Sequence, residues 1–144
     1  MHLHSSIDDF GYRASRFVAD HDISGVIKVV VTTPSTGSFW LATDVVSHTT
    51  VNITITEDVT IGAAGTAMTF FNRNRQGDHP DDCECLIERD GTYTGGTEIL
   101  SKVELRAERD NHTLLKPSTS YLVTVTSKAD NNYTSVLVWV WQGR

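Results

Sequence analysis

Apolar and polar side chains alternate strictly at several places along this chain. In Val51–Thr56 and again in Tyr121–Thr126, every second residue is apolar and the residues between are polar. Successive side chains of a β-strand point to opposite faces of a sheet, so each segment predicts a strand with one buried face. Ser135–Gln142 is apolar on both faces, which predicts a central strand or one covered by a partner. The expected core comprises Ile53, Ile55, Met68, Val123, Val125, Val138 and Val140.

Turn-forming residues separate these segments and keep the expected strands short. Pro34–Gly37, Gly62–Gly65 and Asp130–Asn132 are examples. Ile99–Arg109 contains good helix formers, but it alternates and is interpreted as a strand, and Cys83–Ile87 is interpreted as another with both cysteines inward. About eight or nine short strands at this spacing are typical of an all-β sandwich or barrel. The sequence therefore predicts a single all-β sandwich domain.

The first 22 residues have a different pattern, with isolated apolar side chains among charged ones and no clean alternation. One interpretation is a terminal strand or a short helix packed on its own domain, and the other is an arm ordered against another subunit. The second interpretation divides the chain into an extended N-terminal arm, residues 1–22, and a sandwich domain, residues 23–144. Aromatic and Arg side chains often carry most of an interface's energy, so the candidate contact residues are Phe10, Tyr12, Arg13, Arg16 and Phe17.

Composition excludes several classes of function. The 144 residues include 12 Lys and Arg against 18 Asp and Glu, a formal net charge of −6. This acidic balance argues against a general nucleic-acid binder, because phosphate contacts need clustered basic residues. No apolar run approaches the ~20 residues that span a bilayer, and the N-terminus lacks the pattern of a signal peptide. We therefore expect neither nucleic acid nor membrane as a partner.

Residue types that carry chemistry are present, but not in catalytic or metal-binding patterns. In an extended strand, Cys83 and Cys85 lie too far apart for the ~3.5–4.5 Å between Cβ atoms that a disulfide needs, so free thiols in a reducing cytosol are expected. His2 and His4 have no third ligand at a metal-binding spacing. The sequence also lacks a nucleophile elbow and a phosphate loop. It predicts a protein that is not an enzyme and has no metal or cofactor.

Three segments occur in a distinctive order. Gly65–Arg75 is a Gly-Thr-Ala strand that ends in Asn-Arg-Asn-Arg, Leu114–Thr126 contains Leu-Lys-Pro-Ser-Thr-Ser-Tyr-Leu, and Val136–Trp141 lies near the C-terminus. Together they resemble small tailed-bacteriophage head proteins of the jelly-roll capsid-decoration, or cement, type. The resemblance covers roughly residues 50–142, and the paired cysteines and the charged stretch Glu104–Asp110 depart from the family's pattern.

This resemblance implies a jelly-roll-like β-sandwich and a structural virion protein that binds the assembled phage head and stabilises it by bridging major-capsid subunits. It implies two partners, the major capsid protein and further copies of the chain, often as a homotrimer. The protein would then lie on the capsid exterior after assembly in the host cytoplasm. Arg73 and Arg75 would form a structural turn or an intersubunit contact, because a guanidinium offers five donors to carboxylates or carbonyls. The alternative is that they belong to a solvated polar loop.

A second functional hypothesis uses the same fold class. Trp40, Trp139 and Trp141 would form an exposed aromatic platform in a tail-associated or surface adhesin that binds host glycans. Aromatic side chains also dominate cores and subunit interfaces. Exposed, coplanar Trp rings favour the adhesin, and buried rings favour the structural protein.

Overall fold

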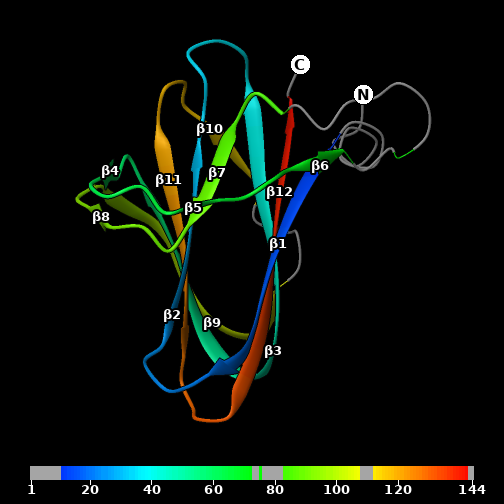
Figure 1. Ribbon diagram of the computed structural model, residues 1–144, viewed down its shortest axis with the longest axis vertical. Helices are drawn as coiled ribbons and strands as arrows, with labels where there is room; N and C mark the ends of the chain where they lie inside the picture. Colours follow the sequence, from blue (N-terminus) through cyan, green and yellow to red (C-terminus); the bar gives the residue numbers. More distant parts are fainter. Residues whose placement is uncertain (1–10, 73–74, 76–82, 108–111, 143–144) are drawn as a thin grey trace.

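The residues that the structure describes form twelve β-strands and no helix (Figure 1). The computed structural model describes residues 11–72, 75, 83–107 and 112–142. No helix within these ranges could cross a membrane. The strands are β1 (Tyr12–His21), β2 (Val26–Thr32), β3 (Phe39–Glu57), β4 (Thr60–Ile61), β5 (Thr66–Ala67), β6 (Phe71–Asn72), β7 (Leu86–Arg89), β8 (Tyr93–Thr94), β9 (Thr97–Ala107), β10 (Thr113–Leu115), β11 (Ser120–Ser127) and β12 (Asn132–Gln142).

Ten of these strands form one antiparallel sheet in the order β5-β7-β2-β11-β3-β12-β1-β6, with β9 and β10 also paired to β3. The short strands β4 and β8 form a separate two-stranded sheet. The prediction of an all-β fold is confirmed, and the curled sheet is consistent with a jelly-roll-like β-sandwich.

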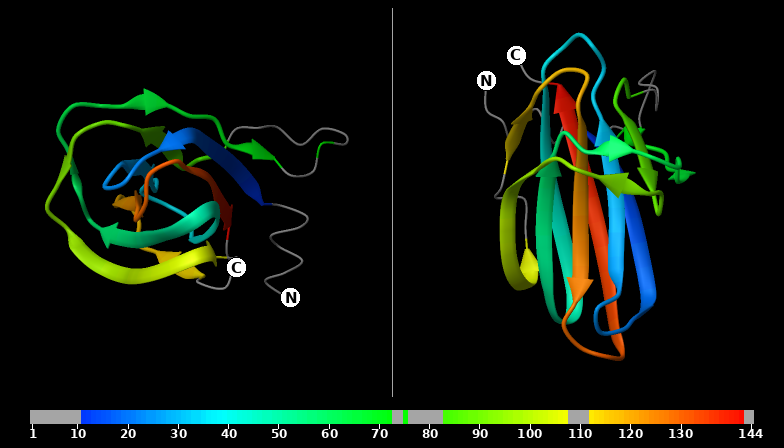
Figure 2. Two further views of the ribbon diagram at one scale, coloured as in Figure 1. Left: turned by 90° about the horizontal axis from the view of Figure 1, so that it is seen from below. Right: turned by 90° about the vertical axis from the view of Figure 1, so that its left-hand side faces the viewer.

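The long strand β3 makes the sheet fold over on itself. Its first part, Phe39–Ser47, pairs with β12, and its second part, Val51–Glu57, pairs with β11. The pairing with β9 shifts register between Val46 and Val51, where an irregularity bends β3. The β12–β1 half and the β11–β2 half therefore lie opposite each other, as the two views of Figure 2 show.

The main core fills the space between these two halves. Strand β11 shows the expected alternation, because Tyr121, Val123 and Val125 are each at most 1% exposed while the residues between are half-buried. Ile53, Ile55, Val138 and Val140 are likewise buried, as predicted. Met68 is an exception: it is only partly buried and packs against the edge of the core.

The predicted N-terminal arm is wrong for the part of it that the structure describes. Tyr12–His21 is β1, which pairs with β12 from Tyr12 opposite Val140 to His21 opposite Asn132. This ladder joins one side of the β1 backbone to β12, and Ala14 enters the core with 2% exposure. There is thus no domain boundary after residue 22, and the alternative of a strand on its own domain holds for residues 12–21. Phe10 lies outside the described residues.

The strand predicted from Cys83 differs from the structure. Glu84 and Cys85 lie in a bend directly before β7, so the strand begins only at Leu86. At the end of β1, His21 is 3% exposed: its Nε2 donates to the carbonyl of Gly25 at 2.7 Å, and its Nδ1 lies 2.7 Å from the Thr134 hydroxyl. By contrast, the predicted strand at Ile99–Arg109 is confirmed as β9 over Thr97–Ala107.

Two tyrosine hydroxyls are held by carboxylates. The Tyr121 hydroxyl donates to Glu57 at 3.0 Å and accepts from the backbone N–H of Lys116 at 2.8 Å. Burial, together with the Glu57 hydrogen bond, raises the pKa of Tyr121 to about 12, although the Lys116 N–H acts in the opposite direction. Burial likewise raises the pKa of Tyr93 to about 12, with a further contribution from its hydrogen bond to Glu88.

We expect two of the chain's four tyrosines to ionise late in an alkaline titration of the folded protein. Their folded-state pKa lies above the unfolded value of about 10, so the stability that they contribute is complete below pH 10 and is lost as the pH rises through about 12. Tyrosinate absorbance measures this directly. In Tyr121→Phe, the absorbance change near pH 12 should be smaller than in the wild type by the contribution of one tyrosine. An unchanged late component in that variant would contradict the assignment.

Candidate functional site: an arginine and phenylalanine surface

The N-terminal strand and the Asn-Arg-Asn-Arg motif meet in the structure. Strand β6 pairs with the start of β1, with Tyr12 opposite Asn72 and Arg13 opposite Phe71. These segments are about sixty residues apart in sequence, and Figure 1 shows them at the same corner of the sheet. Two regions predicted separately as contact regions therefore belong to one surface.

A cavity of about 350 Å³ lies beside this corner. Strand β1 contributes Arg16 and Phe17, β6 contributes Phe71, and β7 contributes Arg89. Arg75 joins them, because its guanidinium carbon lies 5.7 Å from the centroid of the Phe71 ring. We call these five residues the Arg–Phe surface: Arg16, Phe17, Phe71, Arg75 and Arg89.

The two phenylalanines of the Arg–Phe surface remain largely in solvent. Phe17 is 58% exposed and Phe71 is 51% exposed, whereas the neighbouring Phe70 points into the core and is 3% exposed. Adjacent residues of an extended segment face opposite sides, and here Phe70 faces the core while Phe71 faces outward. Large exposed aromatic side chains close to one another are typical of interaction sites rather than of ordinary protein surface.

One carboxylate lies against two arginines of the Arg–Phe surface. Asp90 lies 2.6 Å from a guanidinium nitrogen of Arg89 and 3.7 Å from one of Arg16, so one carboxylate serves two guanidinium groups. The Nε of Arg16 is buried and has no hydrogen-bond partner within the described part of the chain. On a chain with a formal net charge of −6, this surface groups three arginines, and their guanidinium N–H groups can donate hydrogen bonds to the carboxylates of an acidic partner.

The other predicted contact residues have different positions. Tyr12 is partly buried and packs against the core. Arg13 lies flat on Trp139, with its guanidinium carbon 5.3 Å from the ring centroid. Arg73, like Phe10, falls outside the described residues. Of the predicted contact residues, the structure therefore brings Arg16, Phe17 and Arg75 together in the Arg–Phe surface.

Phe71 and Arg89 were missed by the sequence analysis. The adjacent pair Phe70 and Phe71 carried a signal, since a strand cannot bury both side chains on one face. Arg89 carried none: it reaches the surface because β7 lies next to β5, and that pairing depends on the topology of the whole sheet.

The tryptophans do not form an exposed platform. Trp139 is 4% exposed and Trp141 is fully buried, in a second small cluster with Ala42. Trp40 stacks on Trp141 at 6.3 Å with an angle of 11°, and the Trp139 N–H donates to Asp44 at 3.1 Å. A glycan cannot stack on buried rings, so the observation on which the adhesin hypothesis depended is absent for Trp139 and Trp141.

Within the described ranges, no group of three or more His, Cys, Asp or Glu side chains is placed to hold a metal ion. The Arg–Phe surface offers aromatic contact from its phenylalanines and hydrogen bonds from its guanidinium groups to carboxylates or carbonyls.

Comparison with known proteins does not assign a family. No protein-family model matches the chain, and no curated protein matches it significantly. Among solved structures, a chain of the assembly described as "KBV activated particle at acidic pH" is 10% identical, with a TM-score of 0.19. The alignment covers 94% of this chain and 48% of that one, so this chain spans about half its length. A TM-score this low supports no argument about fold or function.

Proposed function

We propose that this chain is a structural virion protein, a capsid-decoration protein that binds an assembled phage head and stabilises it by bridging major-capsid subunits. The observation that carries the proposal is the Arg–Phe surface, where two half-exposed phenylalanines lie among three arginines. Interface residues with the largest energies are enriched in aromatic side chains and Arg, grouped in or beside pockets. The motif order of Gly65–Arg75, Leu114–Thr126 and Val136–Trp141 supports the same function.

In this proposal the partners are the major capsid protein and further copies of the chain, in a homotrimer on the capsid exterior after assembly in the host cytoplasm. The chain acts through binding alone and is not an enzyme. The locally basic Arg–Phe surface suits a capsid region that presents carboxylates or free carbonyls next to an apolar side chain. The arginines then donate hydrogen bonds to the oxygens, and the phenylalanines pack against the apolar side chain.

Cosedimentation with heads of the same phage that lack this chain tests the proposal. We expect saturable pelleting with the heads, and light scattering of the free protein should give a mass of three times 15.9 kDa. A protein that stays monomeric at high micromolar concentration and does not pellet with heads would rule out this function.

A further inference from the structure

The two cysteines of the chain lie in a bend rather than in a strand. The bend includes Glu84 and Cys85 and comes directly before β7. In a fully extended chain, residues two apart have Cα atoms about 6.6–6.8 Å apart, at the upper limit for a disulfide. A bend shortens this separation, and the Cys83 and Cys85 thiols share a hydrogen bond. The geometric reason for expecting two independent thiols therefore does not hold.

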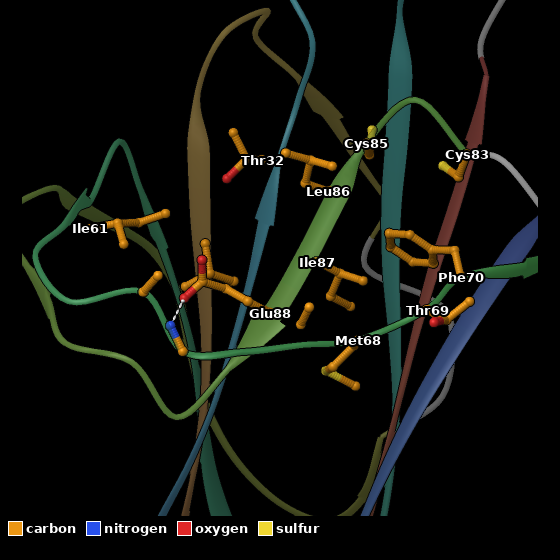
Figure 3. Close-up of a pocket in the computed structure, with 14 residues that line it drawn as sticks. Thr32, Ile61, Met68, Thr69, Phe70, Cys83, Cys85, Leu86, Ile87 and Glu88 are labelled. Atoms are coloured by element: carbon orange, nitrogen blue, oxygen red, sulfur yellow. Dashed lines mark hydrogen bonds between the residues drawn. The ribbon is translucent and has the colours of Figure 1, made fainter.

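Both thiols line a cavity of about 490 Å³ (Figure 3). Figure 3 shows them at one end, above Phe70, while Met68 and Glu88 lie further along. The far end is closed by the segment at Gly65, whose N–H donates to Glu88 at 2.5 Å. Gly65 approaches β7 so closely that a Cβ there would clash with the carbonyl oxygen of Arg89. The cavity gives a small reagent a route to the thiols.

The two thiols differ in access. Cys83 is half-buried, whereas Cys85 is 3% exposed. The hydrogen bond with Cys83, and after it burial, strongly raises the pKa of Cys85, so this thiol keeps its proton. Only a thiolate attacks a disulfide, and attack requires access to the sulfur. Reaction with an outside reagent therefore begins at Cys83, and Cys85 lies in position to act second.

The geometry points to a thiol pair, Cys83 and Cys85, that closes to an intramolecular disulfide by exchange with a small-molecule disulfide of the glutathione class. In the first step the Cys83 thiolate attacks one sulfur of the reagent, a mixed disulfide forms, and one reagent thiolate leaves. Once Cys83 is part of the mixed disulfide, it no longer holds the Cys85 proton through the hydrogen bond between the two thiols. In the second step Cys85 therefore gives its proton to water and attacks the Cys83 sulfur, which releases the second reagent thiolate. The two cysteines are oxidised by two electrons in total, and the reagent disulfide is reduced to two thiols.

This inference does not depend on the proposed function, since it concerns the isolated chain. It implies that the pair stays reduced in a reducing cytosol and closes when the protein reaches an oxidising medium. The disulfide would form just before β7, in the lining of the 490 Å³ cavity.

The test is treatment of the folded protein with oxidised glutathione, followed by alkylation in denaturant and intact-mass analysis. Because the chain has two cysteines, the mass identifies every state. We expect the wild type to lose the mass of two hydrogens and to take up no alkylating agent. Cys85→Ser should accumulate one glutathione on Cys83, and Cys83→Ser should stay unmodified by glutathione.

Three results would overturn the inference. The first is a wild type that keeps two alkylatable thiols, and the second is one that retains bound glutathione as Cys85→Ser does. The third is Cys83→Ser reacting as fast as Cys85→Ser, because the order of attack would then be wrong. Circular dichroism of both variants checks that each is folded before the reaction.

Discussion

Val125→Asp should abolish the fold. Val125 is fully buried in β11, where it lies opposite Ile27 of β2 and Ile53 of β3. An unpaired carboxylate among these side chains costs several kcal/mol, which is comparable to the total stability of a small domain, about 5–15 kcal/mol. Circular dichroism and thermal unfolding should show a chain without a cooperative transition.

Val103→Asp is the matched control for this prediction. Val103 lies in β9 and is 56% exposed, so the carboxylate that this substitution introduces stays in water. Surface substitutions of this kind usually change stability by no more than about 0.5 kcal/mol. A Val125→Asp protein as stable as Val103→Asp would mean that the assigned inward face of β11 is wrong.

Strands with one buried face could be predicted from the sequence, because burial alone produces their alternation. Strand β11 is an example, because its inward residues Val123 and Val125 each lie opposite a core residue on both flanking strands. Strand β12 was predicted as central for a related reason: its two faces are buried in two different clusters, the main core and the tryptophan cluster.

Strand β1 could not be recognised in the same way. Among its residues Ala14 and His21 are buried, and the outward positions include the apolar Phe17, so no alternation of polarity marks it. Its partner β12 is more than a hundred residues away, and long-range pairing leaves no local pattern. The strand predicted from Cys83 was wrong for a different reason. Residues two apart share a face in a strand, but they can also lie close together in a bend, and the spacing of the cysteines does not distinguish the two.

The candidate site illustrates the same limit. Arg16, Phe71 and Arg89 come from three segments that are brought together by the pairing of β1 with β6 and of β5 with β7. The residue types indicated contact chemistry at two of these segments. Their convergence on one cavity follows from the fold of the whole sheet.

Phe17→Ala combined with Phe71→Ala should weaken binding to phage heads by at least about 100-fold. Truncation of an aromatic interface anchor commonly costs about 2 kcal/mol or more, and each 1.4 kcal/mol changes Kd about tenfold. Both side chains are more than half exposed, so the variant should keep its fold. Binding is measured as the fraction of protein that cosediments with heads over a range of protein concentrations.

The most direct test of the Arg–Phe surface compares this double variant with Ile99→Ala/Val103→Ala in the same cosedimentation titration. Ile99 and Val103 are also exposed and apolar, but they lie on β9, which β3 and β12 separate from β1. We expect the β9 variant to bind heads as the wild type does and the phenylalanine variant to lose binding. Equal binding by the wild type and the phenylalanine variant would contradict the assignment of the Arg–Phe surface as the docking site.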